Sequence, residues 1–374
     1  MSSPGTPHHE PLSARIVATA RTTESRALLV AASAFALAFL TAIIGVRFQP
    51  LPIAGAWSLG AWTSAVAAIA ATIAFCIGYL LPAPSATRRV RPTMPGWRLA
   101  LDISALALAH GFTTLLLLEG LSIVMAQAFL GAVVFPFSSM VVISAVTAAA
   151  AYVAYLSAAE MTATRLASVF TVFLVVGVIA SMLSTSDSVW WEKNISALGV
   201  PDDLGSLVFT ITLVVAGAVI TALADYLAVE LEASGMARSP RDQSEHPATV
   251  RIRLMRIGLL AFGVSLTLVG AFHVNWVEWV HNTFSIALVV VFAALVIALP
   301  LLVPRIPGVF VTVGYAFLVV IIGAILLFAL GIYTLTATEI VCFALVITWL
   351  IVLIRNISAG SGDTMLPLAA TPRA

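Results

Sequence analysis

Polar side chains able to bind a ligand gather in two short segments between long apolar runs. The first, Trp190–Gly199, reads Trp-Trp-Glu-Lys-Asn-Ile-Ser-Ala-Leu-Gly and holds the only lysine of the chain; the second runs from His273 to Ser285. The candidate binding residues of the two segments are Trp190, Trp191, Glu192, Asn194, Ser196, His273, Trp276 and His281. Tryptophan, imidazole and carboxylate side chains can hold a lipid headgroup, a metal ion or one another.

These three uses require different geometries. Imidazole and carboxylate groups are suitable zinc ligands, so His273, His281 and Glu192 would support a metal-dependent intramembrane hydrolase. The two histidines are eight residues apart, however, which is no recognised ligand spacing, and we expect no metal site. The alternatives are a polar headgroup pocket, or a structural network in which Asn194 and Ser196 cap a turn. Because half-buried polar groups need partners, we expect His281 within hydrogen-bonding reach of Glu192–Ser196.

A second group of candidates lies inside the apolar runs themselves. These residues are Asp102, His110, Glu119 and Asp225. An ionisable side chain at mid-bilayer is costly and is therefore a functional candidate. An alternative function is accordingly a secondary transporter or proton-coupled permease that uses Glu119 and His110. Nine residues separate these two, or about 180° around a helix, so they need other helices to form one site. Asp102 and Asp225 lie closer to the ends of their runs.

The composition shows what must position these residues. Of the 374 residues, 61% are hydrophobic and only 9% are charged, whereas about a quarter are charged in a soluble domain. Apolar runs of about 20 residues predict transmembrane helices. We count ten spans, approximately Arg26–Val46, Ala61–Leu81, Leu99–Val124, Pro136–Ala158, Arg165–Thr185, Ser206–Ala228, Met255–His273, Ser285–Val303, Phe310–Leu330 and Glu339–Arg355.

The positive charges predict the orientation of these spans. With a cytoplasmic N-terminus, every basic residue except Arg47 and Lys193 falls on the inner side. The positive-inside rule therefore predicts that both termini are cytoplasmic and that the two polar segments face outward. We expect an all-α, multi-pass protein of the plasma membrane, with its ten spans arranged as four plus six. Its parts would be disordered tails at 1–25 and 357–374, a four-helix unit at 26–158 and a six-helix module at 165–356.

Short motifs in the C-terminal half carry a family resemblance. They are Glu192–Gly199 with its Ile-Ser-x-Leu-Gly sequence, Phe209, Gly270, His273, and the approach from His281 to Ser285. The stretch from about Arg165 to Arg355 thereby resembles the bacterial membrane family catalogued as domain of unknown function 998. It is more distantly similar to the eukaryotic damage-regulated autophagy modulator and Sfk-type membrane proteins. The family pattern has one outer histidine, and either His273 or His281 could be its equivalent.

The resemblance implies a six-helix membrane module and assigns no activity to it. The chain also has no Walker loop, dinucleotide fingerprint, cysteine cluster or nucleophile elbow, so no catalytic residue or cofactor is predicted. We therefore expect a non-enzymatic module that binds membrane lipid, or a protein partner in the membrane, at its outer face. No nucleic-acid partner is expected.

Overall fold

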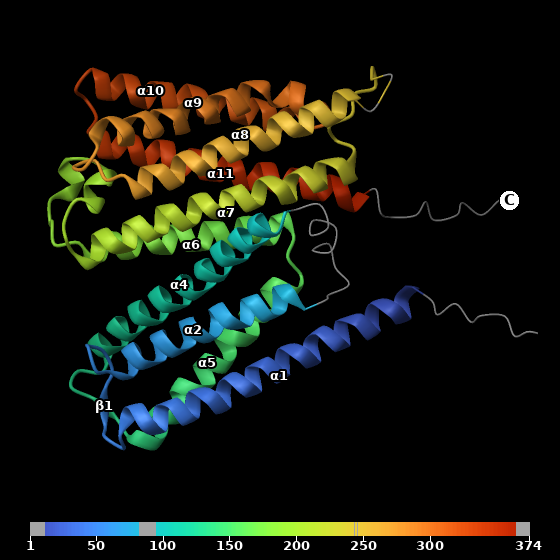
Figure 1. Cartoon of the computed structure of the whole chain (residues 1–374). Coiled ribbons are helices and arrows are strands. Elements are labelled where there is room, and N and C mark those ends of the chain that lie inside the picture. The colour runs from blue at the N-terminus through green and yellow to red at the C-terminus, as the bar shows by residue number, and fades with distance from the viewer. Residues whose placement is uncertain (1–11, 82–94, 243, 245, 364–374) are drawn as a thin grey trace, which may run out of the picture. The chain divides into compact units, whose positions relative to one another are not determined.

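The architecture is known from a computed structural model, which describes residues 12–81, 95–242, 244 and 246–363 (Figure 1). Within these residues, ten helices are long and apolar enough to cross a membrane. All ten predicted spans are thereby confirmed, and the all-α class with them. The chain is a multi-pass integral membrane protein, because ten apolar helices of this length have no other low-energy environment.

The helices keep the labels of Figure 1, and several are longer than predicted. They are α1 (Leu12–Val46), α2 (Leu59–Leu80), α4 (Gly96–Ala128), α5 (Pro136–Ala159), α6 (Ala163–Ser184), α7 (Leu204–Ser234), α8 (His246–Ala271), α9 (Glu278–Leu302), α10 (Gly308–Ala329) and α11 (Leu335–Asp363). Two short 3-10 helices, η2 (Trp190–Glu192) and η3 (Ile195–Gly199), connect α6 to α7.

The first and last helices extend into segments that were expected to be disordered tails. Helix α1 begins at Leu12, and α11 continues to Asp363. Once a helix is nucleated, each further residue adds a hydrogen bond, so propagation continues through polar sequence beyond the apolar run. The remaining parts of the two expected tails, residues 1–11 and 364–374, lie outside the described residues.

The chain forms two compact units. Of the described residues, the first contains 12–81 and 121–161, and the second contains those from 95 to 120 and from 162 to 363. This division differs from the expected four-plus-six arrangement at one helix, since most of α4 belongs to the second unit. The sequence could not indicate this, because the ion pair between Arg98 of α4 and Asp225 of α7 joins residues far apart in the chain.

In the first unit, α5 packs against both α1 and α2. Small residues allow the close approach: a Cβ atom on Gly78 of α2 would lie 2.6 Å from the carbonyl oxygen of Tyr155 in α5. The connections of this unit pair as a two-stranded antiparallel sheet of β1 (Leu51–Pro52) and β2 (Val133–Val134). The pattern of apolar residues did not predict this two-stranded sheet.

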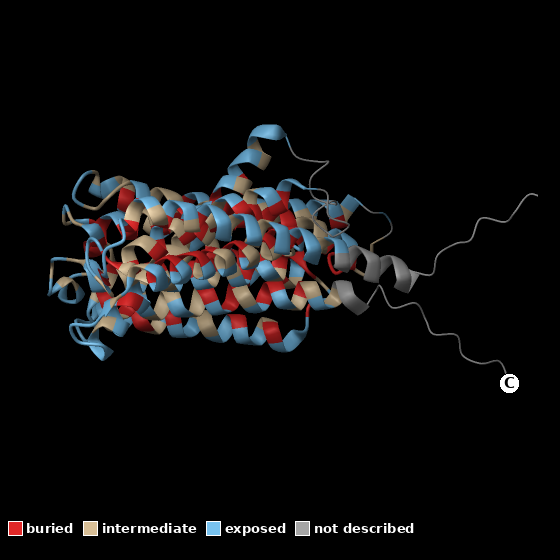
Figure 2. Ribbon diagram, turned by 90° about the horizontal axis from the view of Figure 1, so that it is seen from below, coloured by how far each residue is buried: buried red, intermediate tan, exposed pale blue. Residues whose placement is uncertain are grey.

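In the second unit, helices α6 to α11 lie side by side, with α7 packed against both α6 and α8 (Figure 1). Buried and exposed residues alternate along the helices, as the view from the side of the first unit shows (Figure 2). The exposed residues include many large apolar side chains. A Cβ atom on Gly217 would lie 2.5 Å from the carbonyl oxygen of Gly263, so α7 and α8 meet backbone to backbone. Trp349 of α11 is fully buried between the rings of Phe292 and Phe310.

Three connections of the second unit gather at one end of its helices: α6 to α7, α8 to α9, and α10 to α11 (Figure 1). This end carries both predicted polar segments. The arginine-rich connection between α7 and α8 lies at the opposite end (Figure 1).

Candidate functional site

The two polar segments meet through His281, a buried residue in the first turn of α9. Its Nε2 atom lies 2.9 Å from the hydroxyl oxygen of Ser196, and its Nδ1 atom lies 2.8 Å from the backbone carbonyl oxygen of Phe272. A carbonyl oxygen only accepts hydrogen bonds, so in the neutral ring Nδ1 carries the hydrogen and Nε2 accepts from Ser196. The predicted contact between His281 and the Glu192–Ser196 segment is confirmed.

A third element joins this contact. The side chain of Glu339, in the first turns of α11, accepts a hydrogen bond from the backbone N–H of Ile195 at 2.5 Å. We call Ile195, Ser196, Phe272, His281 and Glu339 the Ser196 cluster. Glu339 was missed as a site residue by sequence reasoning, although a carboxylate at the start of an apolar run is itself a signal. Its partner is a backbone group 144 residues away, which no pattern in the sequence indicates.

The Ile-Ser-x-Leu-Gly motif has a packing role beside its polar one. Leu198 is fully buried, and the carbonyl oxygen of Gly199 accepts a hydrogen bond from the Ser206 hydroxyl at 2.9 Å. A Cβ atom on Gly199 would lie 3.2 Å from the Phe209 ring and 3.7 Å from the imidazole of His273. The absence of a side chain at Gly199 therefore lets η3 lie against α7.

Asn194 does not cap the turn as expected. It stands at the N-terminus of η3, but its side chain makes no capping hydrogen bond, and its Oδ1 atom is buried without a partner among the described residues. A capping side chain would accept a hydrogen bond from the Ala197 N–H. That N–H instead donates to the backbone carbonyl oxygen of Asn194 at 3.1 Å. Ser196 likewise bonds across to His281.

Carboxylates fix the segments on either side of η2. Asp203 caps the start of α7 and accepts hydrogen bonds from Ser206 N–H at 2.8 Å and from the N–H and hydroxyl of Ser186, each at 2.6 Å. Burial acts to raise the pKa of Asp203, but these hydrogen bonds outweigh it and hold the pKa below its usual range. Lys193 and Asp187 form an ion pair at 2.8 Å, and the hydrogen bond from Lys193 lowers the pKa of Asp187.

The second histidine, His273, has separate partners. Its Nε2 atom lies 2.6 Å from the Thr210 hydroxyl, and its ring packs on Trp276 with the ring centres 4.7 Å apart. Partial burial lowers the pKa of His273, and the nearby His281 adds to this effect, while Asp202 opposes it. His273 therefore favours its neutral form.

The predicted binding residues divide into an anchored set and an exposed set. Ser196, His273 and His281 have internal hydrogen-bond partners, and Trp190 is half-buried. Trp191 is 54% exposed and Trp276 is 68% exposed, and the neighbouring Trp279, at 73%, joins them. We call these three residues the exposed tryptophans. Three acidic residues are also exposed at this end: Glu192 and Asp202 between α6 and α7, and Glu278 at the start of α9.

No group of three or more His, Cys, Asp or Glu side chains comes together as a metal site within the described residues. His281 and His273 instead bond Ser196 and Thr210. The alternative of a metal-dependent hydrolase therefore has no ligand set in this part of the chain.

The intramembrane candidates His110 and Glu119 both lie on α4 and are half-buried. The Nδ1 atom of His110 lies 2.8 Å from the carbonyl oxygen of Leu106, one turn earlier in the same helix. A neutral imidazole can donate that hydrogen bond without help from another helix, which supports a structural role for His110.

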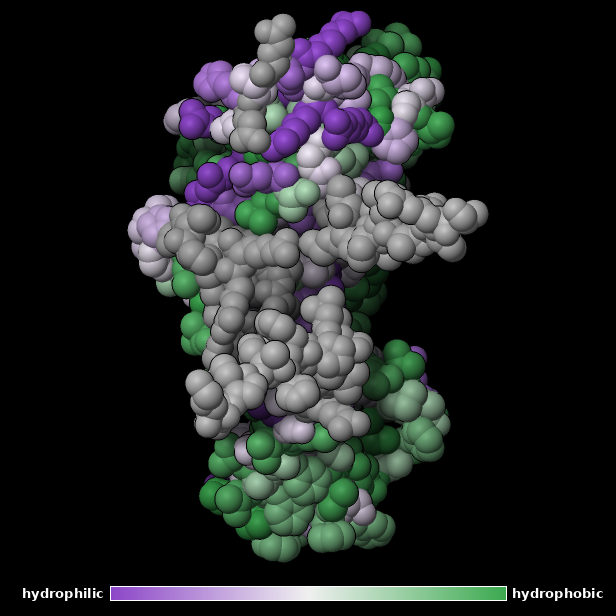
Figure 3. All heavy atoms as spheres, turned by 90° about the vertical axis from the view of Figure 1, so that its right-hand side faces the viewer, coloured by the Kyte–Doolittle hydropathy of each residue, from purple (hydrophilic) through white to green (hydrophobic). Residues whose placement is uncertain are grey.

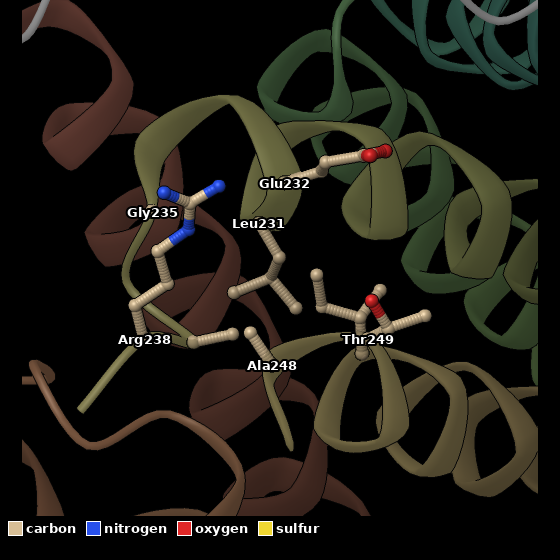
Figure 4. A pocket seen from close by; sticks show the side chains of 8 residues that line it. Leu231, Glu232, Gly235, Arg238, Ala248 and Thr249 are labelled. Atoms are coloured by element: carbon tan, nitrogen blue, oxygen red, sulfur yellow. The ribbon is translucent and has the colours of Figure 1, made fainter. Parts of the chain in front are cut away.

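A pocket of about 110 Å³ lies away from the Ser196 cluster, where α7 turns into α8. Arg238 stands on one side and Glu232 and Thr249 on the other, with Leu231 and Ala248 between them (Figure 4). Hydrophilic residues predominate at this end of the second unit, in the upper part of Figure 3. Nearby, Arg251 binds Asp242 at 2.6 Å, which lowers the pKa of Asp242. No predicted site residue lines the pocket.

Comparisons with protein-family models, with curated proteins and with solved structures find no match to this chain. The family resemblance of the C-terminal half therefore stays a prediction.

Proposed function

We propose that this chain is a non-enzymatic membrane protein whose second unit binds the headgroups of zwitterionic phospholipids through the exposed tryptophans. The observation that carries the proposal is the hydrogen bond between His281 and Ser196 at 2.9 Å. It ties the α6–α7 connection, which bears Trp191, to the start of α9, which bears Trp279 and follows Trp276, so that three amphipathic rings are held at one end of the unit.

The position of these rings supports a lipid ligand. Tryptophan favours the membrane–water boundary, where its apolar ring and polar N–H are both satisfied. A surface that is already ordered loses less conformational entropy on binding, and the Ser196 cluster supplies that order. The positive-inside rule predicts that this face lies outside the cell.

The charge of the face selects the kind of headgroup. Glu192, Asp202 and Glu278 expose carboxylates, whereas Lys193 is paired with Asp187. An acidic surface with tryptophan rings suits an ammonium group, which is attracted both to carboxylates and to the face of an indole. Anionic headgroups would be repelled. Phosphatidylethanolamine and phosphatidylcholine have the required ammonium group.

Native mass spectrometry of the detergent-extracted protein, incubated with a mixture of zwitterionic and anionic phospholipids, tests the proposal. We expect the wild type to retain zwitterionic lipid and a variant with Trp191→Ala, Trp276→Ala and Trp279→Ala to lose most of it. Trp57→Ala in the first unit is the matched control, because Trp57 is also 73% exposed. Equal lipid retention by the wild type and the triple variant would refute the proposal, as would a preference for anionic lipid.

A further inference from the structure

Four ionisable residues, none of them part of the Ser196 cluster, interact inside the second unit. Asp225 of α7 is buried and lies between two guanidinium groups. Its Oδ2 atom is 2.8 Å from Nε of Arg98 in α4, and its Oδ1 atom is 2.5 Å from Nε of Arg256 in α8. One carboxylate thus joins three helices, and these three residues alone carry a net charge of +1.

The fourth residue, Asp102 of α4, has no such ion pair among the described residues. Only 1% of its surface is exposed, and its Oδ2 atom has no hydrogen-bond partner among the described residues. The charges that act on it are those of Asp225 from α7, Arg98 from its own helix and Arg256 from α8. A buried ionised carboxylate without a donor is costly, so this oxygen needs a proton, a cation or a new donor.

The spacing of Arg98 and Asp102 supplies such a donor. Residues four apart on a helix lie on the same face and within reach of each other's side chains. Arg98 therefore has two carboxylates to choose from: Asp225 across the interface with α7, which it binds in this structure, and Asp102 one turn along α4.

We propose that Asp102 is a reversible proton-binding site and that Arg98 moves from Asp225 to Asp102 when the proton leaves. With Asp102 protonated, the four residues have a net charge of +1, and Arg98 links α4 to α7. When the O–H bond of Asp102 breaks and its proton passes to water, the net charge falls to zero and the new carboxylate attracts Arg98. Asp225 then keeps only Arg256, and the α4–α7 link is released.

The surroundings favour a proton over a metal ion as the ligand. Two guanidinium groups lie close by and would repel a second cation, whereas a proton merely neutralises the carboxylate. Hard metal ions also need several oxygen ligands, and no group of three metal-binding side chains is formed by the described residues. The proposed proton site does not depend on the proposed lipid-binding face, so each proposal is tested by its own experiment.

Infrared spectroscopy of the full chain in lipid bilayers tests the proton site directly. Exposed carboxyl groups are ionised above about pH 5, so a protonated-carboxyl band that disappears between about pH 5 and about pH 9 reports a buried acid. We expect this band in the wild type and a clearly smaller band in Asp102→Asn, which imitates the protonated form and preserves the volume. Asp102→Glu should retain a titrating band. Asp202→Asn, at an exposed position, is the matched control.

The exchange of Arg98 has its own test. In Arg98→Gln the ionised Asp102 loses its partner, so the midpoint of the band should move up by about one pH unit or more. Arg253→Gln, an exposed arginine on α8, should leave the midpoint in place. Two outcomes would each overturn the proton site: a wild type with no titrating carboxyl band, and a band of the same size in Asp102→Asn and the wild type. An unmoved midpoint in Arg98→Gln would overturn the exchange.

Discussion

The imidazole of His281 and the hydroxyl of Ser196, 85 residues apart in the chain, form a 2.9 Å hydrogen bond that joins α9 to the connection between α6 and α7. The other ring nitrogen of His281 bonds the carbonyl oxygen of Phe272, so the buried ring uses both of its nitrogens. Adding the bond from Ile195 to Glu339 extends the link to α11. Four stretches of sequence are thereby fixed at one end of the second unit.

Replacing His281 by alanine should destabilise the protein by about 1–3 kcal/mol, because the half-buried Ser196 hydroxyl and Phe272 carbonyl lose their partner. Thermal unfolding in detergent measures the effect. Ser196→Ala should cost less, and the double variant should show a coupling energy of about 0.5–1.5 kcal/mol. Asn282→Ala, at the next and exposed position, should change stability by less than about 0.5 kcal/mol. Strictly additive effects of the His281 and Ser196 changes would contradict a direct bond.

Replacing Glu339 by alanine should loosen the η3 segment, since the Ile195 N–H then has no acceptor. We expect a cost of about 1–3 kcal/mol, whereas Glu339→Gln, whose amide oxygen can still accept, should cost clearly less. Hydrogen exchange at the Ile195 amide checks this locally. Glu278→Ala, which removes an exposed carboxylate at the same end, is the control. Equal exchange rates in Glu339→Ala and the wild type would refute the role of Glu339.

Replacing Gly217 by alanine should destabilise the α7–α8 pair by about 1–3 kcal/mol, because the new Cβ atom would lie 2.5 Å from the carbonyl oxygen of Gly263. Gly323→Ala in α10 is the matched control, since its Cβ atom would meet no atom within 4 Å. That change should be neutral or slightly stabilising, because alanine is the better helix former. Both variants can be compared by thermal unfolding in the same detergent. Equal unfolding temperatures would show that the two helices do not approach so closely.

Acidification should weaken the protein through His273. Partial burial holds the pKa of His273 below the value of about 6.5 expected for the unfolded chain. The unfolded state therefore takes up a proton first. The stability due to this histidine is complete above about pH 6.5 and is lost as the pH falls through the pKa of the folded state.

Unfolding temperatures measured against pH in the wild type and in His273→Gln test this expectation. The variant should show a smaller decline below about pH 6.5 than the wild type. It should keep the loss at lower pH that protonation of Asp187, Asp203 and Asp242 produces, because their pKa values are also lowered. An identical decline from pH 6.5 in the two proteins would exclude His273 as its source.

The sequence alone was enough to predict the ten membrane-spanning helices and their approximate positions. A run of about 20 apolar residues must form a helix in a membrane, where backbone groups find no water, so composition and length fix the ten spans locally. The contact of His281 with the Glu192–Ser196 segment also followed from the sequence, because consecutive membrane helices place alternate connections at one end. Polar residues confined there have few other partners.

The tertiary structure was needed for every feature that depends on which faces of the helices pack together. The assignment of most of α4 to the second unit, the bond of Glu339 to Ile195, and the placement of Asp225 between Arg98 and Arg256 each join residues distant in the chain. An apolar run in a membrane carries little periodic signal, because the core and the lipid are equally hydrophobic. Hydropathy therefore determined that α4 spans the membrane, and only packing determined that Arg98 and Asp102 lie beside Asp225.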